Sequence, residues 1–286
     1  MELSIIIPNL NSPIIDKVLD ALCSQITDKF SAEILVVGVD KPGLVRQNEL
    51  VRFIPTDESA NAAINRNIGI EQAHGELLLF IDADCQPTAG WLECHIARHI
   101  KGEQVVGGAV TFGTDNYFQL SDNVSAFHDL LPFTPEGPRP YLATANLSIN
   151  RDVLKKAGCL NPDLPHAHDL EWTVRFRELG YRLYFDPRAV VVHDPPRRTL
   201  AAVWKHWVDN GPDTLKVRLR YAQLLNTPYL AAQRWLFLWA APIIAAWATI
   251  RTFQNPHTIR RYWYTWPMVF LTKIAWCWGA YWNFPI

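Results

Sequence analysis

The most informative absences in this chain are acidic residues near its end and paired cysteines. No aspartate or glutamate follows Asp213. The five cysteines are odd in number and include no Cys-x-x-Cys pair, so we expect reduced, mostly buried thiols rather than a disulfide framework or a zinc site. With hydrophobic residues at 49% and charged residues at 19%, the 286-residue chain is neither disordered nor fibrous.

The chain also lacks a dinucleotide-binding glycine motif, and its first residues do not read as a signal peptide. No Gly-x-Gly-x-x-Gly follows any predicted strand, which argues against a nicotinamide dinucleotide fold. The opening Met-Glu-Leu-Ser-Ile-Ile-Ile-Pro has neither a basic region nor a cleavage site. We therefore expect no signal peptide, and a catalytic part that faces the cytoplasm.

Charge and tryptophan are distributed unevenly. The formal net charge is −1, but residues 1–213 carry a net −9 and residues 214–286 a net +8. Eight of the twelve Trp follow residue 228. A basic, acid-free and Trp-rich composition is typical of a membrane interface, whereas the long apolar runs argue against nucleic acid as a partner. We expect a catalytic domain over 1–213 and a membrane-associated helical segment over 214–286, with an anionic membrane surface as its partner.

Short apolar strands alternate with helices through the first domain. The expected helices are Asp16–Ile26, Ser59–Ala73, Leu120–Leu131, Arg151–Ala157 and Asp169–Leu179. The expected strands are Leu3–Ile7, Glu33–Val39, Val51–Ile54, Leu77–Ile81, Val105–Val110, Leu147–Ile149, Tyr181–Phe185 and Ala189–His193. This alternation predicts an α/β fold with a mainly parallel sheet flanked by helices on both faces, and a ligand beyond the carboxyl ends of its strands.

Two carboxylates directly follow the most apolar strand, in the run Asp82-Ala83-Asp84. Side by side they repel one another unless a divalent cation neutralises them. Carboxylate oxygens suit Mg²⁺ or Mn²⁺, with a diphosphate completing the coordination shell. The alternative is structural: Asp84 caps a helix that begins near Thr88, and Asp82 binds a backbone amide.

Three further side chains are candidates for the same site. Arg66, on the helix before that strand, is placed to meet a diphosphate or its base, although such a position is more often a solvated helix face. Asp169 is either a helix N-cap or a general base for a sugar hydroxyl. His193 ends the last strand, where it is either a metal ligand or only a strand-end residue.

The order of these motifs resembles the family 2 glycosyltransferases of the A-type nucleotide-sugar fold, over roughly residues 2–215. Asp82-Ala83-Asp84 matches the family's D-x-D motif. The other matching segments are Ser4–Asn11, Ile64–Gly69, Ala145–Leu147 and His168–Glu171, the last followed by Arg175, Gly180 and Tyr181. No single motif is decisive, but five in the family's order and approximate spacing are strong.

The resemblance implies a metal-dependent transfer of one sugar from a nucleotide-sugar donor to a hydroxyl acceptor, with inversion. Asp169 is then the catalytic base, Asp84 and His193 hold Mn²⁺ or Mg²⁺, and Asn146 and Glu171 lie on the acceptor side. The implied donor-binding residues are Pro8, Asn9, Asn11, Asp40, Arg66, Asp82, Ala83 and Asp84.

The sequence departs from the family pattern in three places. In the family, the second strand usually ends in an acidic pair. Here Asp40, shifted by a residue or two, is expected to contact the base of the nucleotide. His168 stands where Glu is usual, which leaves Asp169 in place but alters its electrostatics. Gln233-Arg234-Trp235 only superficially matches the Q-x-x-R-W of processive synthases, which favours single-sugar transfer.

Two other functions are alternatives to the transferase. A sugar-nucleotide nucleotidyltransferase needs a Gly-rich phosphate loop after the first strand, and Pro8–Pro13 has none. A non-catalytic nucleotide-sugar or glycan-binding module of a membrane assembly would tolerate loss of the carboxylates, yet Asp82, Asp84 and Asp169 are all present. We favour a transferase in cell-envelope or exopolysaccharide assembly, with a glycan or lipid-linked acceptor.

The last segment, residues 229–286, is expected to lie on the cytoplasmic face of the plasma membrane. Only 16 uncharged residues separate Arg234 from Arg251, fewer than the ~20 needed to cross a bilayer, and Lys273 splits the next apolar run. We expect two amphipathic helices lying in the membrane plane. A spanning hairpin and a packed soluble appendage are the alternatives.

Overall fold

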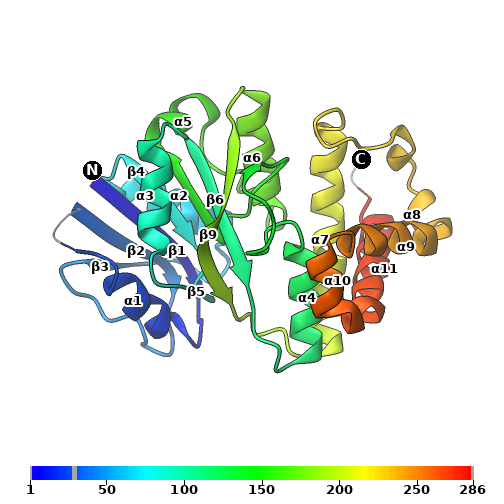
Figure 1. Cartoon of the computed structure of the whole chain (residues 1–286), viewed down its shortest axis with the longest axis horizontal. Helices are drawn as coiled ribbons and strands as arrows, with labels where there is room; N and C mark the ends of the chain where they lie inside the picture. The colour runs from blue at the N-terminus through cyan, green and yellow to red at the C-terminus, as the bar shows by residue number, and fades with distance from the viewer. Residues whose placement is uncertain (1, 28–30, 285–286) are drawn as a thin grey trace. The chain divides into compact units, whose positions relative to one another are not determined.

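The computed structural model describes residues 2–27 and 31–284, and the chain forms two compact units (Figure 1). Unit 1 comprises the described residues up to Thr111 together with Thr134–His193. Unit 2 comprises Phe112–Phe133 and the described residues from Asp194 onward. The boundary expected after residue 213 falls inside helix α7 (Leu200–Arg220). Residues 285 and 286, at the end of the expected membrane-associated segment, lie outside the described residues.

Unit 1 is a nine-stranded mixed sheet flanked by helices, which confirms the predicted α/β fold class. The strand order is β3-β2-β1-β4-β8-β6-β9-β5, with β7 paired to β9. The strands are β1 (Glu2–Leu10), β2 (Ser31–Val39), β3 (Val51–Pro55), β4 (Leu77–Ile81), β5 (Cys85–Pro87), β6 (Val105–Thr111), β7 (Gly137–Pro138), β8 (Asn146–Asn150) and β9 (Leu183–His193). The β3-β2-β1-β4 half is parallel, whereas β8 runs antiparallel to both β4 and β6.

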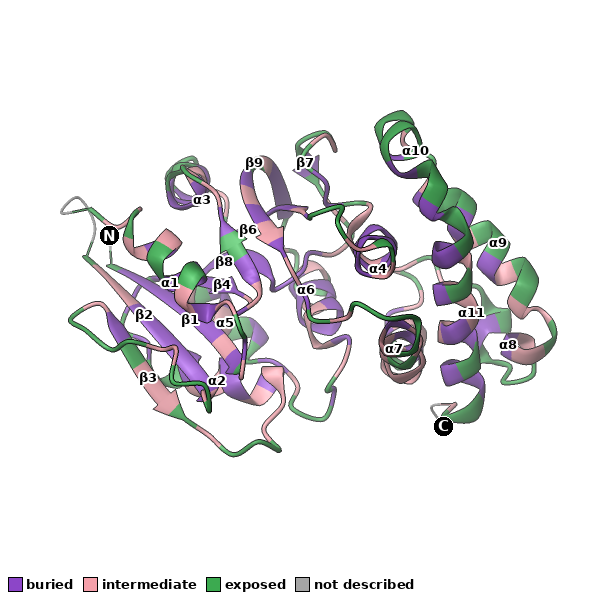
Figure 2. Cartoon of the chain, turned by 90° about the horizontal axis from the view of Figure 1, so that it is seen from below, coloured by how far each residue is buried: buried purple, intermediate pink, exposed green. Residues whose placement is uncertain are grey.

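The continuous apolar strands form because both faces of the sheet are covered. Ile5, Ile6 and Ile7 are fully buried, and so is nearly all of β4 (Figure 2). The helices of unit 1 are α1 (Ile15–Cys23), α2 (Ala62–Gln72), α3 (Trp91–Ile100), α5 (Arg151–Ala157) and α6 (His168–Glu178). Helix α2 packs on β1 and β2, where Gly69 leaves no room for a side chain beside Ile6. This packing fixes Arg66 against the sheet.

Two strands expected near the end of unit 1 are one. Leu183–Phe185, the last part of the first expected strand, and Ala189–His193 both belong to β9, which is parallel to β6 with an irregularity between Gly108 and Ala109. Pro187 and the change of register interrupt the apolar pattern without ending the strand. The continuous strand carries His193 to the edge of the sheet.

Unit 2 is helical and is organised around α11 (Trp266–Trp282). Its other elements are α4 (Tyr117–Phe127), α7 (Leu200–Arg220), η1 (Tyr229–Ala232), α8 (Leu236–Trp239), α9 (Ala241–Thr252), α10 (Pro256–Tyr262) and η2 (Trp263–Thr265). Helix α11 packs against α4, α7, α8 and α9. At its crossing with α7, Gly211 and Gly279 let the two backbones meet, because a side chain on either glycine would collide with the backbone of the other helix. Among the described residues, no helix combines the length and apolar character needed to cross a bilayer.

Candidate active site

The loops after β1, β2 and β4 are joined by side-chain hydrogen bonds. Asn9 Nδ2 donates to the carbonyl of Val39 at 2.9 Å, and Ser12 Oγ donates to the carbonyl of Ala83 at 2.6 Å. Asn11 Oδ1 accepts from the backbone N–H of Lys41 at 2.8 Å. The expected donor-site loops are therefore brought together at the carboxyl edge of the parallel strands, as the fold requires. Ser12 is a contributor that the sequence pattern did not single out.

The two strand ends approach closely because of two unusual backbone positions. Gly38 has φ 142°, and a Cβ there would collide with the carbonyl of Asn9. Asn11 has φ 56°, in the left-handed region that asparagine tolerates. Asn9 is only 1% exposed, so its side chain builds the loop, while the half-buried Pro8 and Asn11 lie nearer its surface.

Asp40 lies just beyond β2, in the place expected for contact with the base of a nucleotide. Its Oδ2 accepts a hydrogen bond from the backbone N–H of Val45 at 2.7 Å, which orients the carboxylate. Its Oδ1 is buried and has no hydrogen-bond partner within the part of the chain that the structure describes. A buried carboxylate oxygen without a donor is costly, so this atom is suited to receive one from a ligand.

Arg66 is not on a solvated helix face. It is 2% exposed, it forms an ion pair with Asp82, and its Nη1 lies 2.8 Å from Nε2 of His168. Burial lowers the pKa of His168, and the positive charge of Arg66 lowers it further. The imidazole therefore stays neutral near pH 7 and accepts the hydrogen bond that Arg66 donates. Arg66 thus joins the end of β4 to the start of α6.

Asp84, Cys85 and His193 form a cluster with metal-ligand chemistry. The antiparallel pairing of β5 with β9 sets Cys85 opposite His193, and Asp84 Oδ1 lies 3.6 Å from His193 Nε2. One ligand atom from each of the three residues lies within 4.8 Å of the others. Burial raises the pKa of the Cys85 thiol well above its usual value, with the Asp84 carboxylate adding to this. The thiol is protonated at neutral pH, which leaves one oxygen and one nitrogen donor.

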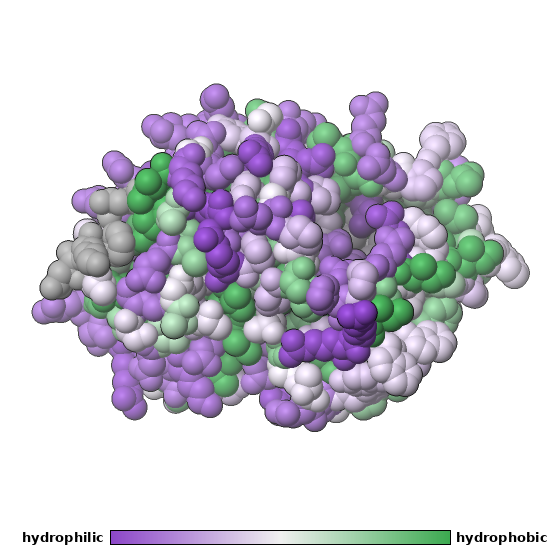
Figure 3. Space-filling view, viewed as in Figure 1, coloured by the Kyte–Doolittle hydropathy of each residue, from purple (hydrophilic) through white to green (hydrophobic). Residues whose placement is uncertain are grey.

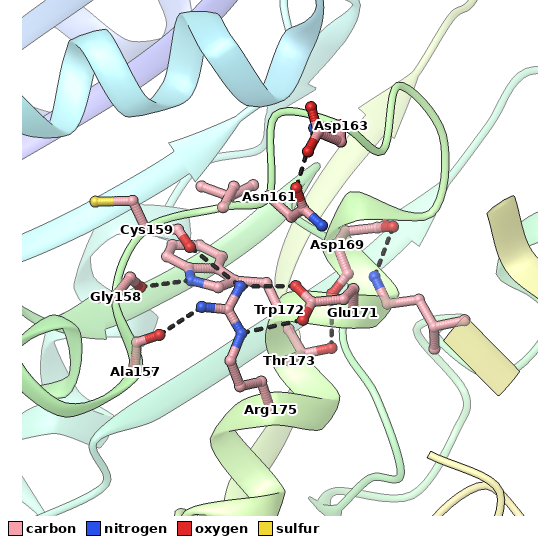
Figure 4. A network of polar contacts seen from close by, with 12 residues as sticks. Ala157, Gly158, Cys159, Asn161, Asp163, Asp169, Glu171, Trp172, Thr173 and Arg175 are labelled. Carbon is pink, nitrogen blue, oxygen red and sulfur yellow. Dashed lines mark hydrogen bonds and ion pairs between the residues drawn. The ribbon is translucent and has the colours of Figure 1, made fainter. Parts of the chain in front are cut away.

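Neither structural alternative for the aspartates holds at Asp84 or Asp169. Helix α3 begins at Trp91 with Gly90 as its N-cap, so Asp84 does not cap it. Helix α6 has Ala167 as its N-cap, in the left-handed conformation at φ 55°. Asp169 lies in the first turn, partly exposed, and its Oδ1 accepts from the backbone N–H of Leu170 at 2.8 Å (Figure 4).

Glu171, expected on the acceptor side, is 2% exposed and bound to Arg175. The two side chains make paired hydrogen bonds of 3.1 and 2.7 Å (Figure 4). Arg175 also donates to the carbonyls of Ala157 and Cys159. Glu171 is thus engaged in a buried ion pair that ties α6 to the loop after α5, and its place on the acceptor side stays a prediction.

Asn146, also expected on the acceptor side, is 1% exposed. Its Oδ1 accepts from Trp91 Nε1 at 2.8 Å and from His95 Nε2 at 2.9 Å. Its Nδ2 donates to the carbonyls of Ala109 and Ala189, both at 2.8 Å. Both oxygen lone pairs and both amide protons are used inside the protein. Asn146 is thus a buried junction of β8, α3, β6 and β9, and its place on the acceptor side stays a prediction.

The comparisons with known proteins agree with this fold and show the family. The model of the family described as glycosyl transferase family 2 matches residues 4–158. Glycosyltransferase AglE of Haloferax volcanii is 30% identical over 226 residues, which cover 75% of this chain and 73% of that protein. A pre-mycofactocin glycosyltransferase of Mycobacterium tuberculosis is 24% identical over 51% of this chain and 32% of its own length.

Solved structures show the same architecture. A Pyrobaculum calidifontis mannosyltransferase in complex with GDP-Man and Mn²⁺ matches with a TM-score of 0.59 and 18% identity, covering 95% of this chain and 86% of that one. GalNAc-T7 with UDP, GalNAc and Mn²⁺ matches with a TM-score of 0.60 and 15% identity, covering 82% of this chain and 51% of that one. The fold and site define a glycosyltransferase of the A-type fold. The chain belongs to glycosyl transferase family 2.

Proposed function

We propose that this protein transfers one sugar from a nucleoside-diphosphate sugar to a hydroxyl acceptor, with inversion at the anomeric carbon. The observation that carries the proposal is the meeting of Asp84 with His193 just beyond β4, 3.6 Å apart. Asp82 lies two residues before Asp84 and pairs with the buried Arg66. Two carboxylates and the buried guanidinium of Arg66 at the carboxyl edge of the sheet suit a donor that carries a metal-bound diphosphate.

The donor atoms of this cluster fit a divalent cation. A carboxylate oxygen and an imidazole nitrogen suit Mn²⁺ or Mg²⁺, and the protonated Cys85 thiol does not compete for the metal. We assign Asp84 and His193 as the protein ligands. When bound, the metal offsets the charge that develops on the departing nucleoside diphosphate.

Asp169 is proposed as the general base. Its carboxylate lies in the first turn of α6 and is partly exposed, so it is open to an acceptor. It takes the proton of the acceptor hydroxyl while that oxygen bonds to the anomeric carbon. The bond to the nucleoside diphosphate breaks in the same displacement, and the leaving oxygen keeps the electron pair. One displacement from the opposite face inverts the anomeric configuration.

The acceptor is proposed to be a glycan or a lipid-linked molecule, in cell-envelope or exopolysaccharide assembly at the cytoplasmic face of the plasma membrane. The support is the composition of residues 214–286, which hold eight basic residues and no acidic one. Such a segment is favoured near anionic headgroups.

The test is the binding of nucleoside diphosphates with and without Mn²⁺, followed by thermal shift. A nucleotide at 100 times its Kd stabilises the protein by ~2.7 kcal/mol. We expect this shift only with the metal, and we expect Asp84→Ala to abolish it without unfolding the protein. Asp152→Ala is the matched control, because Asp152 is an exposed carboxylate on α5. Nucleotide affinity unchanged in Asp84→Ala with Mn²⁺ present would overturn the metal assignment.

A further inference from the structure

Helix α9 presents large apolar side chains outward and small residues inward, and Trp239 at the end of α8 is exposed as well, whereas Phe237 of α8 is buried. Residues at helical spacing form an exposed apolar stripe made of Trp239 (79% exposed), Ile243 (73%), Trp247 (60%) and Ile250 (66%). The buried positions of α9 are Ala245, Thr249 and Thr252. This is the reverse of a helix that packs on the core of a protein in water, where the large apolar residues face inward. The stripe is therefore suited to an apolar environment outside the chain.

The exposed apolar side chains continue beyond α9. Figure 3 shows hydrophobic residues gathered over the part of unit 2 that holds α8, α9 and α10. Apart from the stripe, the exposed large residues between positions 229 and 266 are Tyr229, Leu230, Trp235, Ile259, Trp263, Tyr264 and Trp266. Single exposed apolar residues are ordinary on soluble proteins, whereas a contiguous group marks an interaction site. Trp and Tyr dominate this group, and these side chains are enriched where a membrane meets water.

Exposed arginines follow the stripe in the sequence. Arg251 follows Ile250 directly, is exposed, and its guanidinium lies 5.0 Å from the ring centre of Trp247. Arg260 and Arg261 are exposed on α10, in the next helix along the chain. No acidic residue follows Asp213 in the sequence, so nothing in these helices offsets the positive charge. The charge and the apolar stripe together complement a surface that is anionic outside and apolar just beneath.

The lengths of the helices decide how they would meet such a surface. Helix α9 has 12 residues and α10 has 7. At ~1.5 Å per residue, α9 extends roughly 18 Å, well short of the ~30 Å of bilayer hydrocarbon. A helix with a one-sided apolar stripe and this length lies along the membrane plane.

We propose that Trp239, Ile243, Trp247, Ile250, Arg251, Arg260 and Arg261 form a membrane face that docks α8 and α9 in the plane of an anionic lipid bilayer. The stripe enters the boundary between headgroups and acyl chains, and the arginines bind the headgroups. The proposal deepens the proposed function and rests on it only for the idea that the acceptor lies at the membrane. The membrane face itself is defined by exposure and charge, without reference to catalysis.

The experiment measures binding of the full chain to vesicles of pure phosphatidylcholine and to vesicles containing phosphatidylglycerol, by co-sedimentation. We expect at least tenfold stronger partitioning to the anionic vesicles. The triple variant Ile243→Ser/Trp247→Ser/Ile250→Ser should lose most binding to both kinds of vesicle. The triple variant Arg251→Gln/Arg260→Gln/Arg261→Gln should lose only the preference for anionic lipid, and high salt should have the same effect on the natural protein.

Matched controls come from unit 1. Ile100 is 71% exposed at the end of α3, so Ile100→Ser removes an equally exposed apolar side chain elsewhere. Lys101→Gln/Lys155→Gln/Lys156→Gln removes three exposed charges outside the membrane face. Both controls should bind vesicles as the natural protein does.

Nucleotide binding in the absence of vesicles separates this proposal from the proposed function. A protein that binds the nucleotide but shows no preference for anionic vesicles overturns the membrane face and leaves the transferase intact. If the apolar triple variant instead removes a dimer seen by analytical ultracentrifugation and leaves vesicle binding unchanged, the stripe serves a second copy of the chain and the proposal is wrong. Loss of vesicle binding in either control also contradicts it.

Discussion

Large apolar side chains are exposed far more often in unit 2 than in unit 1, although unit 2 also buries large ones such as Phe237 and Met268. In unit 1, strand β4 and the centre of β1 are buried to within about 1% exposure, and the polar site lies at the strand ends. In unit 2, Trp239 and Ile243 are more than 70% exposed, while α7 and α11 meet through Gly211 and Gly279. Helices that contact an environment other than water, such as a membrane, typically place large apolar side chains on their outer face and small residues where they pack on one another.

Lys273 shows that the interior of unit 2 also holds a basic side chain. In the sequence it interrupts an apolar run, and its charge argues against a membrane span. In the structure its Nζ donates to the carbonyl of Ser125 at 3.2 Å and lies 4.4 Å from the ring centre of Trp207. Burial is the main cause that lowers its pKa to about 7, and the nearby positive charge of Arg218 contributes to the same shift. The lysine is thus accommodated by α4 and α7, within the protein.

The sharpest separation of the two units comes from Asp169→Asn. Loss of a general base should lower turnover by roughly 10²–10⁴-fold, because the amide cannot accept the proton of the acceptor hydroxyl. Nucleotide affinity and vesicle binding should not change, since the substitution is nearly isosteric and lies in unit 1. Turnover is measured by release of nucleoside diphosphate. Retained turnover would show that Asp169 is not the base. Loss of vesicle binding in this variant would contradict the assignment of catalysis to unit 1 and membrane binding to unit 2.

Truncating one aromatic in each unit tests the contrast in burial. Phe80 is fully buried and packs edge-on to Trp172 at 5.3 Å, so Phe80→Ala should lower the free energy of unfolding by ~3–5 kcal/mol. Trp247 is 60% exposed, so Trp247→Ala should change it by no more than ~0.5 kcal/mol. Chemical denaturation measures both. A loss above ~2 kcal/mol for Trp247→Ala would mean that the stripe packs on protein.

The buried histidines of unit 1 predict its response to acid. Burial lowers the pKa of His95 to about 4 and that of His99 to about 4. As pH falls from 6.5 toward 4, the unfolded chain takes up protons that the folded chain does not, so the free energy of unfolding falls in this window. The loss is about 3 kcal/mol for His95 alone.

Denaturation between pH 7 and 4 measures this effect. His95→Asn/His99→Asn should be less stable at pH 7 yet lose less stability on acidification. The control His257→Asn changes an exposed histidine of unit 2 and should follow the natural protein. An unchanged slope in the double variant would contradict the assignment.

The smallest expected effect is that of His168→Gln. Neutral His168 accepts a hydrogen bond from Arg66, and a glutamine amide oxygen is able to replace it. We expect the change at pH 7 to be no more than ~1 kcal/mol in transition-state free energy. The acid limb of turnover should become shallower, because glutamine cannot take up the proton that would repel Arg66 from this position. His166→Gln is the control, since His166 lies two residues earlier, in the loop that leads into α6. If turnover of the variant falls with decreasing pH as steeply as that of the natural protein, protonation of His168 does not affect the site.

The fold class and several site residues could be predicted from the sequence because they depend on local pattern. Continuous apolar strands such as Leu77–Ile81 predict burial on both faces, and the carboxylates after them predict a site at the strand ends. The alternation also predicted α2 and α6 with nearly correct bounds. The same pattern could not show that the sheet turns antiparallel at β8, since pairing is a relation between distant segments.

The roles of individual polar residues were decided by tertiary contacts. Arg66 has the pattern of an exposed helix residue but is buried against Asp82 and His168. Asn146 and Glu171 lie in motifs of the site but use their hydrogen bonds inside the protein. A motif fixes where a side chain sits along the chain, and only its partners in space determine whether it faces a ligand.

The sequence alone determined the uneven charge of this protein, because the lack of acidic residues after Asp213 needs no fold to be read. It also fixed which residues could meet at the strand ends. Only the tertiary structure decided that Trp247 points outward while Thr249 is buried, and that His193 reaches Asp84. The physical reason is that burial and approach depend on the packing of segments remote in sequence, which local periodicity does not contain.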